Sequence, residues 1–314
     1  MNLFICFTPL QLTLAKKIIE QNSISKNECY LFYYSYHDNL KEKHHFHRYS
    51  SDFDRSFYFN ERMSLLFLAK LYVLAKKLKK IDVLYLSSVD NGIVHFFMSY
   101  LNFDILNTFD DGTANISKDS VFYIQPKKSF IKNILHILLG KRFDLKSICK
   151  KTSQHYTIYP EFENITNKIT PLNLLNYTAN NINELDSKKS INCFLGSIYH
   201  EIVTNSIHVN FLEYRVVETV NSLDAIYFPH PRETVGLNVG HFSSDKRIAE
   251  EIVVDYLQQG YHVNVYGFSS SAQFNLLNIP GVTCYVIDSI MLKDAFRKLH
   301  CLAVNKGACA FYID

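Results

Sequence analysis

The sequence of 314 residues predicts an α/β protein made of two Rossmann-like domains. Short uninterrupted apolar runs recur along the chain, as expected of strands buried on both faces of a parallel sheet. These runs alternate with helical patterns in both halves, which favours doubly wound sheets. A polar, Asn-rich stretch separates the halves. We therefore expect an N-terminal domain over 1–160, a linker over 161–190 and a C-terminal domain over 191–314.

The first predicted unit is a strand over Leu3–Phe7 that runs directly into a helix. Thr8 is suited to cap this helix, and Pro9 is suited to its first turn. The amino end of the helix could face an anion or a sugar hydroxyl, and it could equally be a plain structural cap.

The rest of the first half repeats this alternation. The predicted strands are Cys29–Tyr36, Val83–Leu86 and Ile105–Phe109, and the predicted helices are Glu61–Lys80 and Ile93–Leu101. Four histidines fall within residues 37–47 without a consistent ligand spacing, so a solvated loop or helix face is expected there rather than a metal site.

The second half shows the same order of elements. The predicted strands are Asn192–Leu195, Ala225–Phe228, Val263–Tyr266 and Val282–Val286, and the predicted helices are Val203–Val220, Asp245–Gln259 and Met291–His300. The expected place for a donor substrate is between the two domains, at the carboxyl ends of the strands.

Composition narrows the class of protein. A net charge of +3 excludes a dominant role in binding polyanions, and no nucleic-acid partner is expected. The seven cysteines contain no Cys-x-x-Cys pair, which indicates reduced thiols in the cytoplasm. Residue 2 leads straight into a strand pattern, so we expect no signal peptide. The basic amphipathic segment 127–151 is either an ordinary surface helix or a contact for anionic headgroups and lipopolysaccharide phosphates.

Three polar clusters follow predicted strands: Asp110-Asp111-Gly112, His230-Pro231-Arg232 and Ser269-Ser270-Ser271. A carboxylate suits deprotonation of a sugar hydroxyl. A His, an Arg and a set of hydroxyls suit a departing phosphate. Prolines on both sides of the His remove backbone donors, so side chains have to do the binding.

At these residues the chain resembles the bacterial lipooligosaccharide sialyltransferases of glycosyltransferase family 52. The resemblance is carried by Asn2–Gln11, Thr108–Asn115, His155–Ile158, Leu195–Ser197, Pro229–Gly236 and Phe268–Ala272. It implies a GT-B fold, with two Rossmann-like domains facing a central cleft. It also implies an inverting, metal-independent transfer of sialic acid from CMP-sialic acid to a terminal galactose-type residue of lipooligosaccharide, without a cofactor.

The resemblance also implies roles for individual residues. His230 becomes the general acid or phosphate-stabilising group, and the serine loop binds the phosphate or carboxylate of the donor. The substrate-binding residues expected in this way are Thr8, Gln11, Gly112, Thr113, Gly196, Ser197, His200, Pro231, Arg232, Phe268, Ser269, Ser270 and Ser271. Family members can be homodimers, and the expected location is cytoplasmic, with peripheral contact at the inner face of the inner membrane.

The general base is left open. A relative carries Asp where this chain has Tyr199, so the base is expected to be Glu201 or His200 after a small register change, or Asp110 or Asp111. The alternatives to a sialyltransferase are a glycosyltransferase that uses another nucleotide sugar and a catalytically degenerate, carbohydrate-binding relative.

Overall fold

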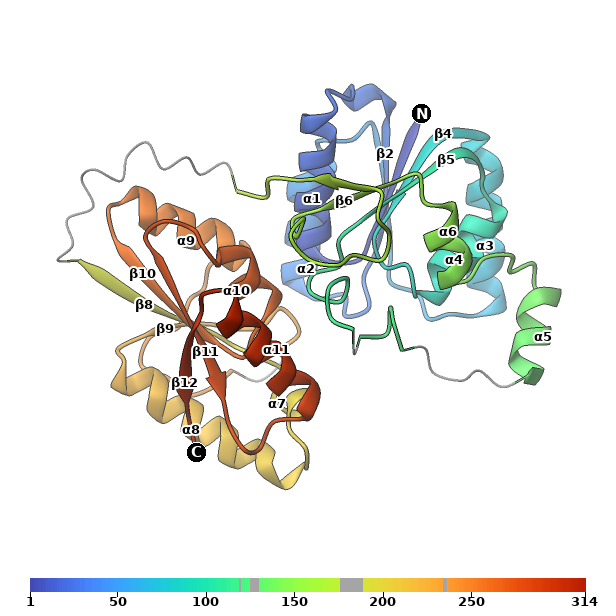
Figure 1. Ribbon diagram of the computed structural model, residues 1–314. Coiled ribbons are helices and arrows are strands. Elements are labelled where there is room, and N and C mark those ends of the chain that lie inside the picture. The colour runs from blue at the N-terminus through green and yellow to red at the C-terminus, as the bar shows by residue number, and fades with distance from the viewer. Residues whose placement is uncertain (119, 125–129, 176–188, 234–235) are drawn as a thin grey trace. The chain divides into compact units, whose positions relative to one another are not determined.

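The computed structural model describes residues 1–118, 120–124, 130–175, 189–233 and 236–314. The chain divides into two compact units, Met1–Leu174 and Leu175–Asp314. Each unit has its own parallel sheet and its own core (Figure 1).

The first unit contains a sheet of seven strands in the order β3-β2-β1-β4-β5-β6-β7, with every pair parallel. Its strands are β1 (Asn2–Cys6), β2 (Cys29–Tyr34), β3 (Arg55–Phe59), β4 (Lys80–Leu86), β5 (Asn102–Phe109), β6 (Gln154–Thr157) and β7 (Ile169–Pro171). Its helices are α1 (Pro9–Gln21), α2 (Leu40–Ser50), α3 (Leu65–Leu78), α4 (Gly92–Tyr100), α5 (Phe130–Leu138) and α6 (Leu145–Lys151), with a 3₁₀ turn η1 over Lys26–Glu28.

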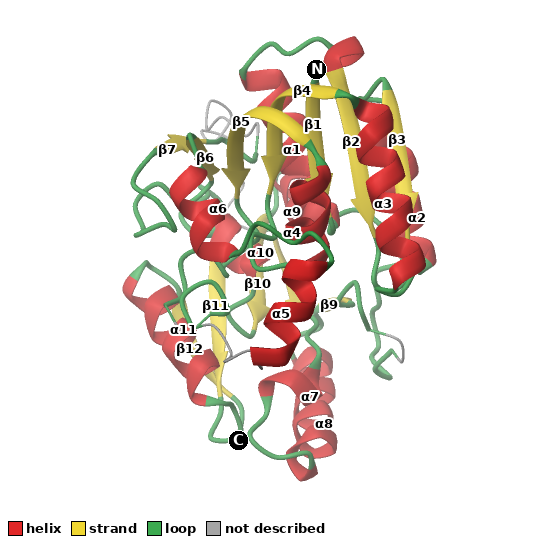
Figure 2. Ribbon diagram, turned by 90° about the vertical axis from the view of Figure 1, so that its right-hand side faces the viewer, coloured by secondary structure: helices red, strands yellow, loops and turns green. Residues whose placement is uncertain are grey.

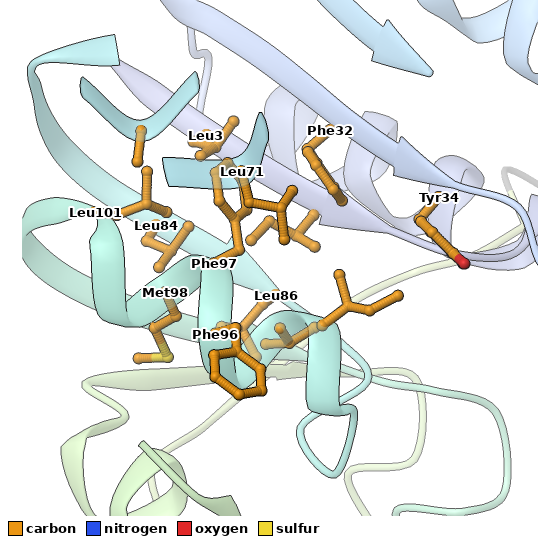
Figure 3. Packing of buried hydrophobic residues seen from close by; sticks show 14 of the residues in the cluster. Leu3, Phe32, Tyr34, Leu71, Leu84, Leu86, Phe96, Phe97, Met98 and Leu101 are labelled. Carbon is orange, nitrogen blue, oxygen red and sulfur yellow. The ribbon is translucent and has the colours of Figure 1, made fainter. Parts of the chain in front are cut away.

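Helices cover both faces of this sheet, with α1 and α2 on one face and α3 and α4 on the other (Figure 1). Alternate residues of each strand therefore enter different layers. Leu3 and Phe32 lie in the α3–α4 layer against Leu71 and Phe97, all fully buried (Figure 3). Burial on both faces explains the uninterrupted apolar runs in the sequence.

The second unit contains a sheet of five parallel strands in the order β12-β11-β10-β8-β9. Its strands are β8 (Ser190–Leu195), β9 (Ile226–Phe228), β10 (His262–Gly267), β11 (Val282–Asp288) and β12 (Cys309–Tyr312). Its helices are α7 (Tyr199–Ile202), α8 (Ile207–Ser222), α9 (Ala249–Gln258), α10 (Ser271–Leu276) and α11 (Asp294–Asn305), drawn in red beside the yellow strands in Figure 2.

Every strand predicted from the sequence is present. β3, β6, β7 and β12 were not predicted, and β7 lies inside the range 161–190 that was expected to be a linker. Residues 169–171 instead form β7, which pairs with β6 at the edge of the sheet, and none of its three residues is fully buried. The rest of the expected linker includes 176–188, which lie outside the described residues.

The basic segment 127–151 is two helices rather than one. α5 and α6 are separated around Gly140, whose φ of +87° belongs to the left-handed region that ends helices. Lys127 and Lys128 lie outside the described residues. The histidine-rich stretch forms α2, which Asn39 caps through the backbone N–H of Glu42.

Candidate active site

Polar side chains meet at the carboxyl edge of the first sheet. Because β1, β4 and β5 are parallel neighbours, the loops that follow them share one edge. The first loop leads into α1, which carries Gln11, the second contains Ser88, and the third begins with Asp110 and Asp111. Open α/β sheets bind ligands at this edge.

Asp111 is held by two side chains from the other loops. Gln11 Nε2 donates to its Oδ1 at 2.6 Å, and Ser88 Oγ donates to its Oδ2 at 2.8 Å. Gln11 is itself fixed, because the backbone N–H of Phe7 donates to Gln11 Oε1 at 2.6 Å. The carboxylate is therefore oriented by two side chains, and one of them, Gln11, is itself held in place by the main chain.

The environment of Asp111 raises the pKa of its carboxyl above the usual value. Burial is the largest cause, and the nearby negative charges of Asp90 and Asp110 add to it, while the hydrogen bonds from Ser88 and Gln11 act in the opposite direction. A carboxylate with a raised pKa is a stronger base than an ordinary one. Asp111 is only partly buried, so it still reaches the surface of the unit.

Asp110 has a different role from its neighbour. It is fully buried, and its oxygens accept from Asn115 Nδ2 at 2.6 Å, Thr157 Oγ1 at 2.9 Å and the backbone N–H of Ile158 at 2.7 Å. His155 Nε2 lies 3.2 Å away. These contacts link the end of β5 to the end of β6, so Asp110 stabilises the carboxyl edge of the sheet.

The other predicted residues of this unit shape the loops. Thr8 caps α1 by accepting from the backbone N–H of Gln11 at 3.3 Å. Gly112 has a φ of +58°, a conformation that a side chain disfavours. Its neighbour Thr113 accepts through its backbone carbonyl from Ile116 and Ser117, which tightens the turn.

In the second unit, His230 follows β9 at the carboxyl edge and is partly buried. The backbone N–H of Arg232 donates to His230 Nδ1 at 3.1 Å. Because Nδ1 accepts, the proton of the neutral ring resides on Nε2, which can donate to an anionic oxygen. Pro231 joins these two residues and fixes the turn between them.

Glu233 supports this turn, and no pattern in the sequence singled it out. Its Oε2 accepts from the backbone N–H of His230 and from Tyr227 Oη, both at 3.0 Å. Ser88 was missed as well. The signal for Ser88 was its place in a polar turn after a predicted strand, and Glu233 lies within the quoted motif Pro229–Gly236.

Tyr199, which stands where a relative has Asp, is a buried structural residue. Its Oη lies 3.1 Å from Tyr227 Oη. Gly196 allows this arrangement, because a Cβ there would lie 2.8 Å from Tyr227 Cζ and 3.0 Å from Glu233 Oε2. Burial raises the pKa of Tyr199 far above its usual value, so its hydroxyl keeps its proton near neutral pH and cannot serve as a base.

Glu201 is paired with Arg232 by two bonds, of 2.7 Å from Nη1 and 2.6 Å from Nη2. This pair holds the pKa of Glu201 below its usual range, which weakens it as a base. His200 is exposed on the same short helix α7, and Ser197 is partly buried just before it.

The serine loop has two kinds of residue. Phe268 is buried in the core against Tyr199, and Ser270 caps α10 through the backbone N–H of Gln273 at 3.3 Å. Ser269 has a φ of +52°, and its buried Oγ has no hydrogen-bond partner among the described residues. Ser271 opens α10. The loop therefore presents strained backbone and an unsatisfied hydroxyl at the end of β10.

Within the described part of the chain, no three His, Cys, Asp or Glu side chains come close enough together to hold a metal ion. In the same residues no helix combines the length and apolar character that crossing a membrane requires.

Solved structures share the fold at low identity. A glycotransferase of kitacinnamycin aligns with a TM-score of 0.52 at 9% identity, over all of this chain and 86% of that one. LpCGTa in complex with UDP aligns with a TM-score of 0.52 at 10% identity, over 99% of this chain and 84% of that one. The fold is of the GT-B type, as the sequence predicted.

The sequence itself matches the family model described as glycosyltransferase family 52 over residues 20–290. A CMP-N-acetylneuraminate:beta-galactoside alpha-2,3-sialyltransferase of Pasteurella multocida is 30% identical over 282 residues, covering 88% of each chain. An N-acetyllactosaminide alpha-2,3-sialyltransferase of Haemophilus influenzae is 28% identical over 90% of each chain. This chain belongs to glycosyltransferase family 52.

Proposed function

We propose that this glycosyltransferase moves sialic acid from CMP-sialic acid to the hydroxyl of a terminal galactose-type residue of lipooligosaccharide. The names of the Pasteurella and Haemophilus relatives support the donor and the sugar class. The observation that supports the chemistry best is Asp111, an oriented carboxylate with a raised pKa at a ligand-binding sheet edge.

In this proposal Asp111 is the general base. Of the four residues considered for the role, Asp110 uses its oxygens inside the fold, and Glu201 is weakened by Arg232. His200 is exposed on a short helix and has no described partner that would orient it as a base. Asp111 alone combines orientation, partial exposure and a raised pKa.

His230 is assigned to the leaving group. Its Nε2–H would donate to the phosphate of CMP, and Ser269 Oγ would supply a second donor from the serine loop. These groups stabilise the charge that develops as CMP departs, and such stabilisation usually accelerates a reaction more than any other single effect. We propose that the reaction needs no metal ion, and activity that survives EDTA would agree with this.

The step is a single displacement. Asp111 takes the proton of the acceptor hydroxyl, whose oxygen forms a bond to C2 of the sialic acid. The bond from C2 to the phosphate oxygen breaks, and its electron pair leaves with CMP, stabilised by His230. One displacement inverts the anomeric configuration.

We also propose that the protein contacts an anionic bilayer peripherally, at the inner face of the inner membrane. Helix α5 exposes Ile134, Leu135, Ile137 and Leu138, and basic residues follow it at Lys141 and Arg142. Apolar residues next to basic ones suit such a surface. A homodimer that covers α5 is the alternative, and light scattering with and without vesicles distinguishes the two.

The test is transfer from CMP-sialic acid to a lactoside, comparing the wild type with His230→Ala. Loss of most of the rate is expected, and full activity would remove His230 from this role. Thermal shifts with CMP and UDP address the alternatives, because a bound ligand raises apparent stability. A shift with UDP alone would favour another donor, and a shift with CMP without turnover of any acceptor would favour a degenerate relative.

A further inference from the structure

The turn that carries His230 rests on a buried hydrogen-bonded chain. Tyr199 Oη contacts Tyr227 Oη at 3.1 Å, and Tyr227 Oη donates to Glu233 Oε2 at 3.0 Å. The same oxygen accepts from the backbone N–H of His230 at 3.0 Å. Both tyrosines are almost fully buried, so the chain runs from the core to the turn.

Glu233 holds the turn from one side and Arg232 holds it from the other. The backbone carbonyl of His230 accepts from the N–H of Glu233 at 2.9 Å, which closes the turn. The N–H of Arg232 then reaches His230 Nδ1. Pro231, between them, has no N–H to offer, so few donors are available to fix this segment.

We propose that Glu233 is a positioning residue for His230. Its carboxylate accepts from the backbone N–H of His230 and so fixes the main chain there. The backbone N–H of Arg232 is then held where it donates to His230 Nδ1, which keeps the ring proton on Nε2 and fixes the direction in which Nε2–H points. The inference rests on the leaving-group role given to His230 above, and it adds the group on which the geometry of that role depends.

The surroundings of Glu233 agree with this role. Burial raises the pKa of its carboxyl, as does the negative charge of Glu213 on α8. The hydroxyl of Tyr227 and the backbone N–H groups of His230 and Leu237 favour its ionised form. A partly desolvated carboxylate makes stronger hydrogen bonds than an exposed one, because water competes less for its oxygens.

The first experiment is a double-mutant cycle on kcat with full-length protein. Glu233→Ala is expected to lower kcat about 10- to 100-fold, the range for a catalytic group that is slightly misplaced. The KM for CMP-sialic acid should change less than kcat. Glu233→Gln should stay within about 3-fold of wild type, because its amide oxygen can accept the same two bonds. In a His230→Ala background, Glu233→Ala should cost almost nothing further.

Glu218→Gln is the matched control. Glu218 is an exposed glutamate of α8 in the same unit, where it pairs with Arg215, and its replacement should leave kcat unchanged. Equal losses from Glu233→Ala with and without His230 would overturn the proposal, as would full activity of Glu233→Ala.

A second experiment does not depend on activity. The ¹⁵N shifts of the His230 ring report which nitrogen carries the proton. Wild type and Glu233→Gln should show the Nε2–H tautomer, and Glu233→Ala should show a mixture. An unchanged tautomer in a folded Glu233→Ala protein would refute the positioning role. If His230→Ala were fully active while the tautomer shifted as expected, the leaving-group role proposed for His230 would fail and the positioning of His230 by Glu233 would stand.

Discussion

Replacing Asp111 by Asn tests the assignment of the base most directly. The amide keeps the shape of the carboxylate, and its Oδ1 can still accept from Gln11 Nε2, which lies 2.6 Å away in the wild type. Ser88 can turn its hydroxyl to accept from the new amide nitrogen. The substitution therefore removes the proton acceptor and leaves the edge of the sheet in place.

The expected loss is the contribution of a general base, about 10²- to 10⁴-fold in kcat. This corresponds to about 3 to 5 kcal/mol in the activation free energy. The free energy of unfolding should stay the same or rise slightly, because a neutral amide replaces a carboxylate that partial burial disfavours. Structural damage would instead lower both activity and stability.

The assay is the initial rate of transfer from CMP-sialic acid to a lactoside, at saturating donor. Glu201→Gln is the matched control, since it removes a carboxylate from another position and should cost less than about 10-fold. The reasoning is refuted if Asp111→Asn keeps more than a tenth of the wild-type rate while Glu201→Gln loses 100-fold.

Further predictions concern pH and stability. If Asp111 is the base, kcat/KM should rise with pH with a midpoint above the usual Asp value, whereas Glu201 as base would place it below the usual Glu value. The folded state binds the proton of Asp111 more tightly than the unfolded state does. The contribution of this group to the free energy of unfolding therefore falls as pH rises from the ordinary pKa of Asp to the raised pKa of Asp111. Chemical denaturation of the wild type and of Asp111→Asn across this pH range measures that contribution. Gly196→Ala should lower the free energy of unfolding by about 1 to 3 kcal/mol, because its Cβ would press on Tyr227, and a thermal melt with an unchanged midpoint would contradict this. Ser270→Ala should cost about 0.5 to 2 kcal/mol through loss of the α10 cap, and equal stability in denaturant would argue against that cap.

The central strands of both sheets could be predicted because they are buried on both faces. β3 and β12 were not predicted because they lie at sheet edges, where none of their residues is fully buried and the pattern of a buried strand is missing. β7 has only three residues, one of them proline, and a strand this short has no recognisable pattern in the sequence.

Within the site, the sequence was enough to predict that Asp110 and Asp111 follow a strand, but it did not show which of the two is structural and which could act as the base. Their difference depends on partners far along the chain. Thr157 engages Asp110 from β6, and Gln11 engages Asp111 from α1. Glu201 remained a candidate for the base for the same reason, since only the fold brings Arg232 to it.

One consequence of the first unit concerns how such enzymes can be rebuilt. Asp111, Gln11, Ser88 and Phe7 all belong to Met1–Leu174, so the proposed base and the side chains bonded to it are encoded in a single contiguous segment. A chimera that joins this segment to the C-terminal half of another family member would inherit its acceptor-activating group intact. If the C-terminal unit binds the donor, as we expect, the choice of donor could then be changed without altering the residue proposed to remove the proton.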